Sequence, residues 1–496
     1  MSGPSTHSTR ESPASARERQ STATPDTCEG DTTQATPADP ADASIAVLPL
    51  VNMSSDREQD YFSDGLSEEL LNLLAQVPGL HVAGRTSSFS FKDKPATIGE
   101  IGRALHVATV LEGSVRKSGE RVRITAQLVK ARDGYHLWSQ TYDRELTDIF
   151  AVQDEIAAAV VDALKLRLLP AQQPSTAGHH VPTPAAFNHF LLGRQLLNRA
   201  TEEGFHRAVG EFAQAVALEP DYAAALAGLA LAEAYASDYT DSDAAMLDGR
   251  QRASEAAQQA VTRDPALGEA YTARAVLRFV FDLDWTGGDA DFAQALVFNP
   301  GDVMTHWQYS RLLAALGRLP EALASARQAT QLDPLSAQAW EIQARYQLAS
   351  GDIAGARDSL EHALDLAPDH GRAPLGLGMA ALLDGDPDAA RAWYARSNNE
   401  TFRLAGLAMA AHGLGDDAES DRCLRELLAG HAHNSAYQIA GVFAWRDEHD
   451  RAFDWLQRAV SQRDAGLQYL KYDPALRSLR GDPRYEQLLR QLDLPA

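Results

Sequence analysis

The sequence predicts a mixed-sheet α/β domain followed by a right-handed α-solenoid. Two observations lead to this fold class. Short β-branched runs alternate with amphipathic stretches up to residue 170, and a helix–turn–helix pattern recurs at a fixed spacing beyond residue 184. We therefore expect a disordered tail rich in Ser, Thr and Pro (1–44), the α/β domain (45–170), a linker (171–183), the repeat array (184–464) and C-terminal capping helices (465–496).

The repeated unit is 34 residues long and is clearest between residues 301 and 397. Three residue types keep this spacing: a Pro that ends the unit, a Gly after the first helix, and an Ala inside the second helix. They are Pro300, Pro334 and Pro368; Gly317, Gly351 and Gly385; and Ala322, Ala356 and Ala390. Weaker copies on both sides extend the array to about eight helix pairs. These landmarks resemble the tetratricopeptide repeat.

The α/β domain is predicted from segments in the order β-α-β-α-β-β-β-α. Apolar or alternating runs indicate strands at 45–50, 80–84, 108–116, 121–129 and 135–143. Apolar residues at helical spacing indicate helices at 61–77, 97–107 and 149–168. Residues 85–91 (RTSSFSF) are predicted to form a loop. Compact turns between the last three strands indicate an antiparallel part of a mixed sheet.

A family resemblance covers nearly all of this domain. The strings IAVLPLVNMSSD, YFSDGLSEELLNLLA, RTSSF, VLEGSVRKSGERVRITAQLV and GYHLWSQTYDRELTDIFAVQDEIA, within residues 45–168, resemble the TolB amino-terminal-like (FlgO-type) domain. The resemblance implies a bacterial signalling protein in which this domain precedes tetratricopeptide repeats. In such relatives it often follows a nucleotide cyclase, a protein kinase or a winged-helix domain. This sequence contains none of those three, and the resemblance carries over no residue role.

Charge and composition restrict the classes of partner. The net charge is −23, and residues 171–496 hold 28 basic and 44 acidic residues, a net of −16. Nucleic acid binding needs clustered basic surface, so we expect no nucleic-acid partner. The acidity indicates either a soluble helical surface or a basic partner. Two cysteines give no disulfide framework, and no apolar run is long enough to span a membrane. The N-terminus lacks a signal-peptide core, so we expect a cytoplasmic protein.

Motifs for catalysis or metal binding are not found in the sequence. There is no phosphate-binding glycine loop and no G-x-S-x-G elbow. His431, His433 and His449 do not have zinc-ligand spacing. Glu68 and Glu69 are neighbours on the first predicted helix, so their side chains should point in different directions. We expect no catalytic residue, no cofactor and no metal.

The strongest candidate for a binding surface is the concave face of the array, which first-helix positions line in this repeat class. Trp and Arg dominate interface hot spots, so a groove bearing both types could anchor a peptide. The predicted groove residues are Met304, Trp307, Arg311, Gln338, Glu341, Arg345, Arg372, Leu375 and Met379. Trp307 could instead belong to the core between repeats.

A second candidate is the loop after the second predicted strand, because loops at strand ends often carry ligand contacts. Its polar residues are Arg85, Thr86, Ser87 and Ser88. The alternative interpretation is structural: the hydroxyls satisfy backbone groups while Phe89 and Phe91 anchor the loop.

The sequence thus favours a non-enzymatic scaffold or signalling adaptor that binds partner proteins through the concave face of the array. The alternative is a regulatory or sensor module of a cyclase, kinase or winged-helix regulator whose output domain is absent from this chain. A hydrolase with an unrecognised site is a third, weaker interpretation.

Overall fold

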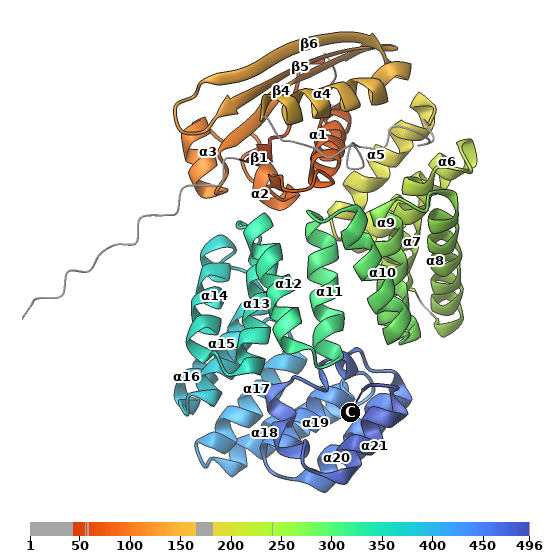
Figure 1. Cartoon of the computed structure of the whole chain (residues 1–496). Coiled ribbons are helices and arrows are strands. Elements are labelled where there is room, and N and C mark those ends of the chain that lie inside the picture. Colours follow the sequence, from red (N-terminus) through yellow and green to blue (C-terminus); the bar gives the residue numbers. More distant parts are fainter. Residues whose placement is uncertain (1–42, 55, 57–58, 165–181, 241, 496) are drawn as a thin grey trace, which may run out of the picture. The chain divides into compact units, whose positions relative to one another are not determined.

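The computed structural model describes residues 43–54, 56, 59–164, 182–240 and 242–495 (Figure 1). The predicted tail (1–44) and linker (171–183) therefore lie almost entirely outside the described residues.

The first part contains one mixed sheet, as predicted. Its strands are β1 (Ser44–Val47), β2 (Val51–Asn52), β3 (His81–Val82), β4 (Thr109–Ser118), β5 (Arg121–Lys130) and β6 (His136–Glu145). The sheet order is β3-β1-β4-β5-β6, and β2 also pairs with β4. β1 is parallel to both β3 and β4, whereas β4, β5 and β6 are antiparallel. The predicted strand at 45–50 is shorter than expected, and β2 was not predicted because two residues carry no periodicity.

Helices α1 (Asp60–Ala75) and α4 (Ile149–Ala163) cover one face of this sheet (Figure 1). They bury its apolar side chains, including Leu111 and Ile124, with Leu66 and Ile156 of the helices. Helix α3 (Ile98–Ala104) follows the short helix α2 (Arg85–Phe89) and belongs to a smaller core with Val110. The prediction of a loop over 85–91 was therefore wrong at its start. A five-residue helix gives little hydrophobic periodicity from which it could be recognised.

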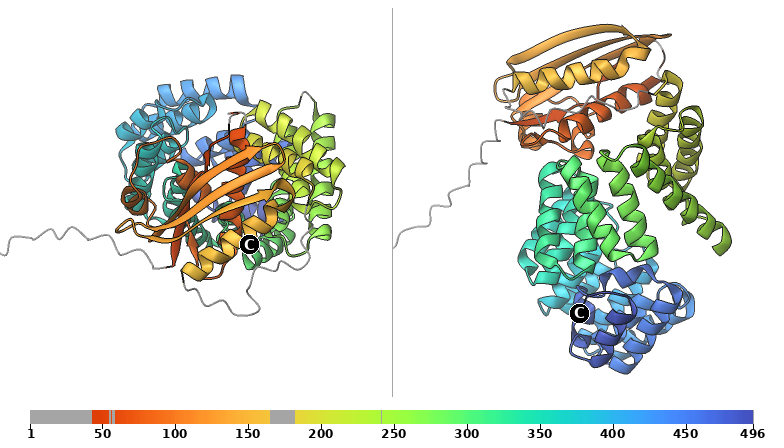
Figure 2. Two further views of the ribbon diagram at one scale, coloured as in Figure 1. Left: turned by 90° about the horizontal axis from the view of Figure 1, so that it is seen from above. Right: turned by 45° about the vertical axis from the view of Figure 1, so that its right-hand side comes forward.

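The array consists of eight antiparallel helix pairs within the described residues, in agreement with the predicted number (Figure 2). The pairs are α5 (Pro184–Asn198) and α6 (Glu202–Leu218); α7 (Ala223–Ser237) and α8 (Asp243–Arg263); α9 (Gly268–Leu277) and α10 (Trp285–Phe298); α11 (Val303–Ala315) and α12 (Leu319–Leu332); α13 (Ala337–Ser350) and α14 (Ile353–Leu366); α15 (Ala373–Leu383) and α16 (Pro387–Tyr394); α17 (Glu400–Gly413) and α18 (Asp417–His431); α19 (Ala436–Trp445) and α20 (His449–Gln462). A π-helical turn, η3 (Arg278–Asp282), follows α9. The C-terminal segment contains η4 (Ala465–Tyr469), η5 (Pro474–Leu479) and α21 (Pro483–Gln491).

The 34-residue landmarks have the predicted roles. Gly317, Gly351 and Gly385 follow first helices with φ of 81°, 86° and 77°, a conformation that strains residues with a Cβ. The alanines that recur every 34 residues are buried between helices: Ala322 and Ala356 are both 0% exposed. Small residues at these points allow each second helix to approach its neighbours closely.

The apolar core is continuous from α1 of the α/β domain to α5 of the array. The rings of Phe62 and Phe187 lie 6.4 Å apart in an edge-to-face arrangement, and Phe187 also contacts Phe190 at 6.3 Å. All three rings are at most 1% exposed. Such burial is typical of a domain interior, so the first helix pair packs against α1 as a core element.

Candidate functional site

A hollow of about 530 Å³ lies on the first-helix face of the array. Its lining comes mainly from first helices of the pairs and from η4 of the C-terminal segment. The lining residues that bear on recognition are Tyr235, Phe281, Gln308, Arg311, Arg372, Phe402, Asn434, Gln438 and Tyr469. The face predicted to bind a partner is therefore hollowed, with aromatic, amide and guanidinium groups around the hollow.

Positive charge converges on this hollow. Arg311 donates to Gln308 Oε1 at 2.7 Å and to Gln468 Oε1 at 2.8 Å. The guanidinium of Arg345 lies 5.2 Å from the ring centroid of Tyr469. Burial alone would raise the pKa of Tyr469, but Arg345, Arg372 and Arg311 outweigh burial and lower this pKa. The lowered pKa reflects the positive potential that these arginines create at the phenol.

The structure brings only part of the predicted groove to the hollow. Arg311 and Arg372 line it, and Arg345 lies behind Tyr469. Arg345 donates to both carboxylate oxygens of Glu341, at 2.7 and 2.9 Å, and Glu341 is only 5% exposed. The charges of Arg345 and Glu341 therefore neutralise each other within α13.

The other predicted groove residues lie away from the hollow. Trp307 is half-buried and packs against the apolar cluster that contains Tyr346 and Tyr472, as its alternative assignment to the core proposed. Met304 is 39% exposed, Gln338 is exposed, and Met379 and Leu375 pack against apolar cores. Their role in partner binding stays a prediction.

The C-terminal segment reaches farther than the predicted capping role. η5 packs against α19 and α21 against α20, as expected of a cap for the last pair. The same segment also returns to the middle of the array. Trp285 Nε1 donates to the carbonyl of Leu492 at 2.8 Å, and the rings of Tyr346 and Tyr472 lie 5.7 Å apart. The prediction of a cap confined to the last repeat was therefore incomplete.

The predicted ligand loop at 85–88 lies against the turn between α12 and α13. The backbone N–H of Gly84 donates to the carbonyl of Leu332 at 2.5 Å, and Ser87 N–H donates to Asp333 Oδ1 at 2.7 Å. Ser87 Oγ accepts from the N–H of Leu335 at 2.9 Å. Ser87 and Ser88 are fully buried. The hydroxyl of Ser87 thus satisfies the backbone of the array, which favours the structural interpretation of this segment.

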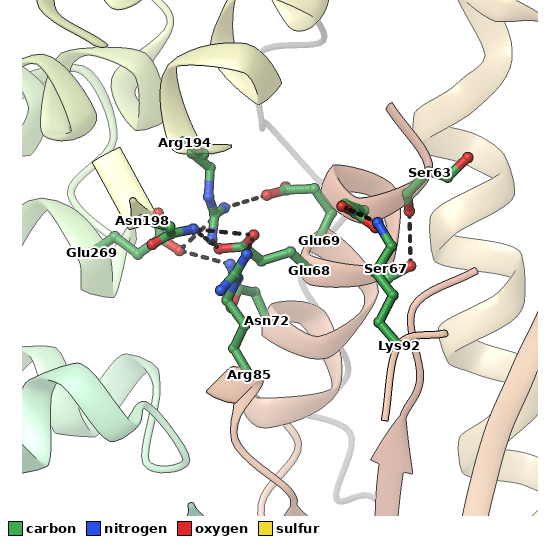
Figure 3. Close-up of polar contacts among 11 residues, drawn as sticks. Ser63, Ser67, Glu68, Glu69, Asn72, Arg85, Lys92, Arg194, Asn198 and Glu269 are labelled. Carbon is green, nitrogen blue, oxygen red and sulfur yellow. Dashed lines mark hydrogen bonds and ion pairs between the residues drawn. The ribbon is translucent and has the colours of Figure 1, made fainter. Parts of the chain in front are cut away.

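Arg85 belongs to a buried network of charges that joins α1 and α2 to the array (Figure 3). Arg194 of α5 donates to Glu68 Oε1 at 2.9 Å and also contacts Glu69 and, at 3.8 Å, Glu269 of α9. Arg85 donates to Glu68 Oε2 at 2.9 Å.

Two amides extend the network. Asn198 donates to Glu68 Oε1 at 3.1 Å, and Asn72 donates to Glu269 Oε1 at 2.9 Å. Three carboxyl groups thus share two guanidinium groups inside the junction.

Glu68 and Glu69 were predicted to point in different directions because they are neighbours on one helix. In the structure both carboxylates reach the forked guanidinium of Arg194, which spans the two (Figure 3). No spacing in the sequence signals this network, because Glu68, Arg194 and Glu269 lie on three elements far apart in the chain.

The three glutamates differ in their protonation. Burial would raise the pKa of Glu68, but Arg194 and Arg85 outweigh it and lower this pKa. Burial raises the pKa of Glu69 to about 7, opposed by Arg194 and reinforced by Glu269 and Glu68. Burial also raises the pKa of Glu269, again opposed by Arg194. The pKa of Glu69 therefore lies close to neutral pH.

Within the described residues, no three or more His, Cys, Asp or Glu side chains are arranged to hold a metal ion. His431 contacts Glu400, and His449 contacts Asp447. The helices of the described chain also include none that is long and apolar enough to cross a membrane.

Comparisons with known proteins match the repeats. A tetratricopeptide repeat family model matches residues 309–359 and 343–398. Among solved structures, PilF of Pseudomonas aeruginosa is 19% identical, with a TM-score of 0.33, and covers 37% of this chain and 86% of its own. A tetratricopeptide repeat protein of Parabacteroides merdae is 14% identical, with a TM-score of 0.39, and covers 54% of this chain and 99% of its own.

One curated relative matches at higher identity. Putative adenylate cyclase 3 of Rhizobium meliloti is 40% identical over 192 residues, which are 39% of this chain and 33% of the relative. The matched region therefore spans about a third of the length of that relative. The family-model match, the helix pairs and the glycine turns together show that this chain carries tetratricopeptide repeats.

Proposed function

We propose that this chain is a non-enzymatic interaction module that holds an acidic peptide segment of a partner protein in the hollow of its repeat array. Tetratricopeptide repeats are generally protein-interaction scaffolds. The observation that carries the proposal is that Arg311 and Arg372 both line the hollow beside Tyr469, in a chain whose net charge is −23. A carboxylate of the partner would complement this local positive potential.

The neutral groups of the hollow suit an extended peptide. Gln438 makes no side-chain hydrogen bond within the described residues, so both its donor and its acceptor are available. The acidic lining residues are already engaged: Asp238 pairs with Arg250 and Asp464 accepts from the N–H of Tyr437. Phe281 and Phe402 add apolar surface beside the arginines. Backbone amides of a peptide could pair with Gln438 while an acidic side chain meets Arg372.

Selection from a phage-displayed library of random linear peptides tests this proposal. We expect the wild-type chain to enrich peptides with Asp or Glu, and Arg372→Ala to lose this enrichment. Arg391→Ala is the matched control, because Arg391 is 54% exposed on α16 and, among the described residues, forms an ion pair with Asp388 alone. Equal enrichment by Arg372→Ala and wild type, or enrichment of peptides without acidic residues, would overturn the proposal.

A second candidate function is a regulatory module of a nucleotide cyclase. The relative named putative adenylate cyclase 3 favours it, since 40% identity over 192 residues indicates common ancestry for that region. The resemblance of residues 45–168 to TolB-like domains fits the same role, because such domains accompany cyclases in signalling proteins. In this function the described α/β domain and array would modulate a catalytic domain supplied by another chain.

Adding the purified chain to the catalytic region of the Rhizobium relative, while following cyclic AMP formation, tests this role. We expect a saturable change in rate. A rate that does not respond at any concentration of the chain would count against it, and it would leave the peptide-binding proposal untouched.

A further inference from the structure

A second cavity, of about 950 Å³, lies in the α/β domain and has no part in the proposed peptide site. Its walls are the segment after β1 (48–54), the first turns of α1, the segment after α2 (91–94), and the middle of β4 and β5. This volume falls in the range of small-molecule sites.

The cavity lies at the point where the direction of strand addition reverses. The chain runs from β1 through α1 to β3 on one side of β1, and then crosses to β4 on the other side. All three strands are parallel. In open α/β sheets, ligands bind outside the carboxyl ends of strands at such a switch point. β1 ends at Val47, and the cavity lining begins at Leu48.

A break in the strand shapes the cavity. After β1, the N–H of Leu48 still donates to the carbonyl of Leu111 at 2.9 Å. The chain then leaves the ladder at Pro49 and Leu50 and pairs again as β2, where Val51 opposes Ser114. Pro49 has no N–H for the ladder, and the N–H of Leu50 donates instead to Ser67 Oγ at 2.8 Å. Across the cavity, Lys92 Nζ lies 2.7 Å from both carboxylate oxygens of Asp64 and ties the segment after α2 to α1 (Figure 3). Both walls are thus fixed by internal contacts.

The floor presents polar groups from two paired strands. Glu112 lies opposite Gln127, and Ser114 lies opposite Thr125. Alternation along the strands places these four on the face opposite the buried core. Directly opposed residues have Cβ atoms about 5 Å apart, so Glu112 and Gln127 can contact one ligand together.

Glu112 is the unbalanced charge of this floor. It is half-buried, and no cation or hydrogen-bond donor among the described residues contacts its carboxylate. Among the other lining carboxylates, Asp64 is engaged by Lys92 and Asp60 by the amide of Asn52, whereas Asp93 is exposed on the segment after α2. Gln127 and Ser114 likewise make no side-chain hydrogen bond within the described chain. At the rim, the apolar side chains of Val51 and Met53 are 62% and 52% exposed.

We propose that this cavity binds a small organic cation, whose protonated amine is held by Glu112 with Gln127 and Ser114 as further acceptors. The hydrocarbon part of the ligand lies against Val51 and Met53. Two kinds of metabolite share this chemistry, aliphatic diamines and free amino acids. The site is independent of the peptide-binding hollow, so either proposal can fail alone.

Isothermal titration of the full chain with putrescine, cadaverine, L-leucine and L-lysine tests the proposal, with adipate as an anion of similar length. We expect saturable binding of at least one amine and none of adipate. Binding by the diamines alone would identify a diamine site, and binding by L-leucine an amino-acid site.

The matched variants are Glu112→Gln and Glu120→Gln, the latter in the exposed turn between β4 and β5. We expect Glu112→Gln to weaken binding about tenfold or more, as for loss of a charge-assisted hydrogen bond, and Glu120→Gln to bind like wild type. Gln127→Ala should weaken binding less and serves as a second variant if Glu112→Gln does not fold. Absence of binding by all four amines, or unchanged affinity in Glu112→Gln and Gln127→Ala, would overturn the proposal.

Discussion

The two ends of the repeat array are held by different chemistry. At the N-terminal end, Arg194 of α5 joins the carboxylates of α1 and α9 in a buried network. At the C-terminal end, the rings of Tyr346, Tyr469 and Tyr472 and the indole of Trp285 hold the C-terminal segment to the middle of the array. The stability of a buried charge network depends on the presence of every charged partner, whereas the stability of packed rings depends on how well their volume fills the interior. The first junction should therefore respond to charge and pH, and the second to cavities.

Removing the shared cation should have the largest effect. Arg194→Ala leaves Glu68 and Glu69 buried together without their common partner, and we expect a loss of about 3–5 kcal/mol in unfolding free energy. Urea unfolding followed by circular dichroism measures it. Arg207→Ala, which removes an exposed guanidinium paired with Glu203, is the control and should resemble wild type. Equal losses in the two variants would show that the network does not stabilise the junction.

Cavity formation at the aromatic junction should come next. Tyr472 is 2% exposed, and its hydroxyl has no hydrogen-bond partner within the described residues. Tyr472→Ala should lower the unfolding free energy by about 3 kcal/mol, because it leaves a cavity against Tyr346. Tyr472→Phe keeps the ring and should be nearly neutral, since it removes only an unpaired hydroxyl. A large loss in Tyr472→Phe, measured in the same urea titration, would contradict a junction held by packing.

The charged junction should also be sensitive to pH. Glu69 has a pKa of about 7 in the folded chain, against an ordinary value near 4.5, so the folded form retains its proton between these values. Its contribution to stability is fully present below pH 4.5 and is lost as pH rises through 7. We expect the unfolding free energy of wild type, relative to that of Glu69→Gln, to fall by about 3 kcal/mol between pH 4.5 and alkaline pH.

Thermal unfolding from pH 5 to pH 8 checks this sign. Comparing wild type with Glu69→Gln at each pH cancels the titration of other carboxylates. A constant difference across the range would show that Glu69 does not titrate there.

The smallest effect is expected at the contact between α2 and the array. Ser87→Ala removes the acceptor of the Leu335 N–H and should cost about 1 kcal/mol. Hydrogen exchange of the Leu335 amide gives the specific measurement and should accelerate. Ser90→Ala is the control, because Ser90 Oγ donates only to the carbonyl of Ser87. If both variants leave the Leu335 amide equally protected, the serine contact is dispensable.

Local chemistry explains which parts of the fold the sequence could predict. The glycine turns and the buried alanines recur at the same place in every repeat unit, so the period of the sequence was enough to predict their positions. The antiparallel strands β4, β5 and β6 alternate in polarity and were predicted for the same reason.

The remaining features depend on contacts between distant residues. Nothing in the spacing of Arg194 and Glu68 indicates that they meet across 126 positions, and the same holds for Arg311 and Gln468, which are 157 apart. For this reason, only part of the predicted groove set lines the hollow. Trp307 and Arg345 are of the residue types expected in a binding groove and lie on first helices. In the structure, however, they contact tyrosines of the C-terminal segment: Trp307 packs in the cluster with Tyr472, and Arg345 lies over the ring of Tyr469.

The return of the C-terminal segment has a consequence for synthesis. Most solenoids can fold repeat by repeat as they emerge from the ribosome, because each unit contacts only its neighbours. Here the hydrogen bond from the indole of Trp285 to the carbonyl of Leu492 can form only after Leu492 has been synthesised, 207 residues later. Until then, Trp285 lacks its hydrogen bond to Leu492 and Tyr346 lacks its contact with the ring of Tyr472. The hollow is therefore complete only after residues 465–469 have been synthesised, and a ribosome stalled before residue 465 would expose a nascent chain with an unfinished inner wall.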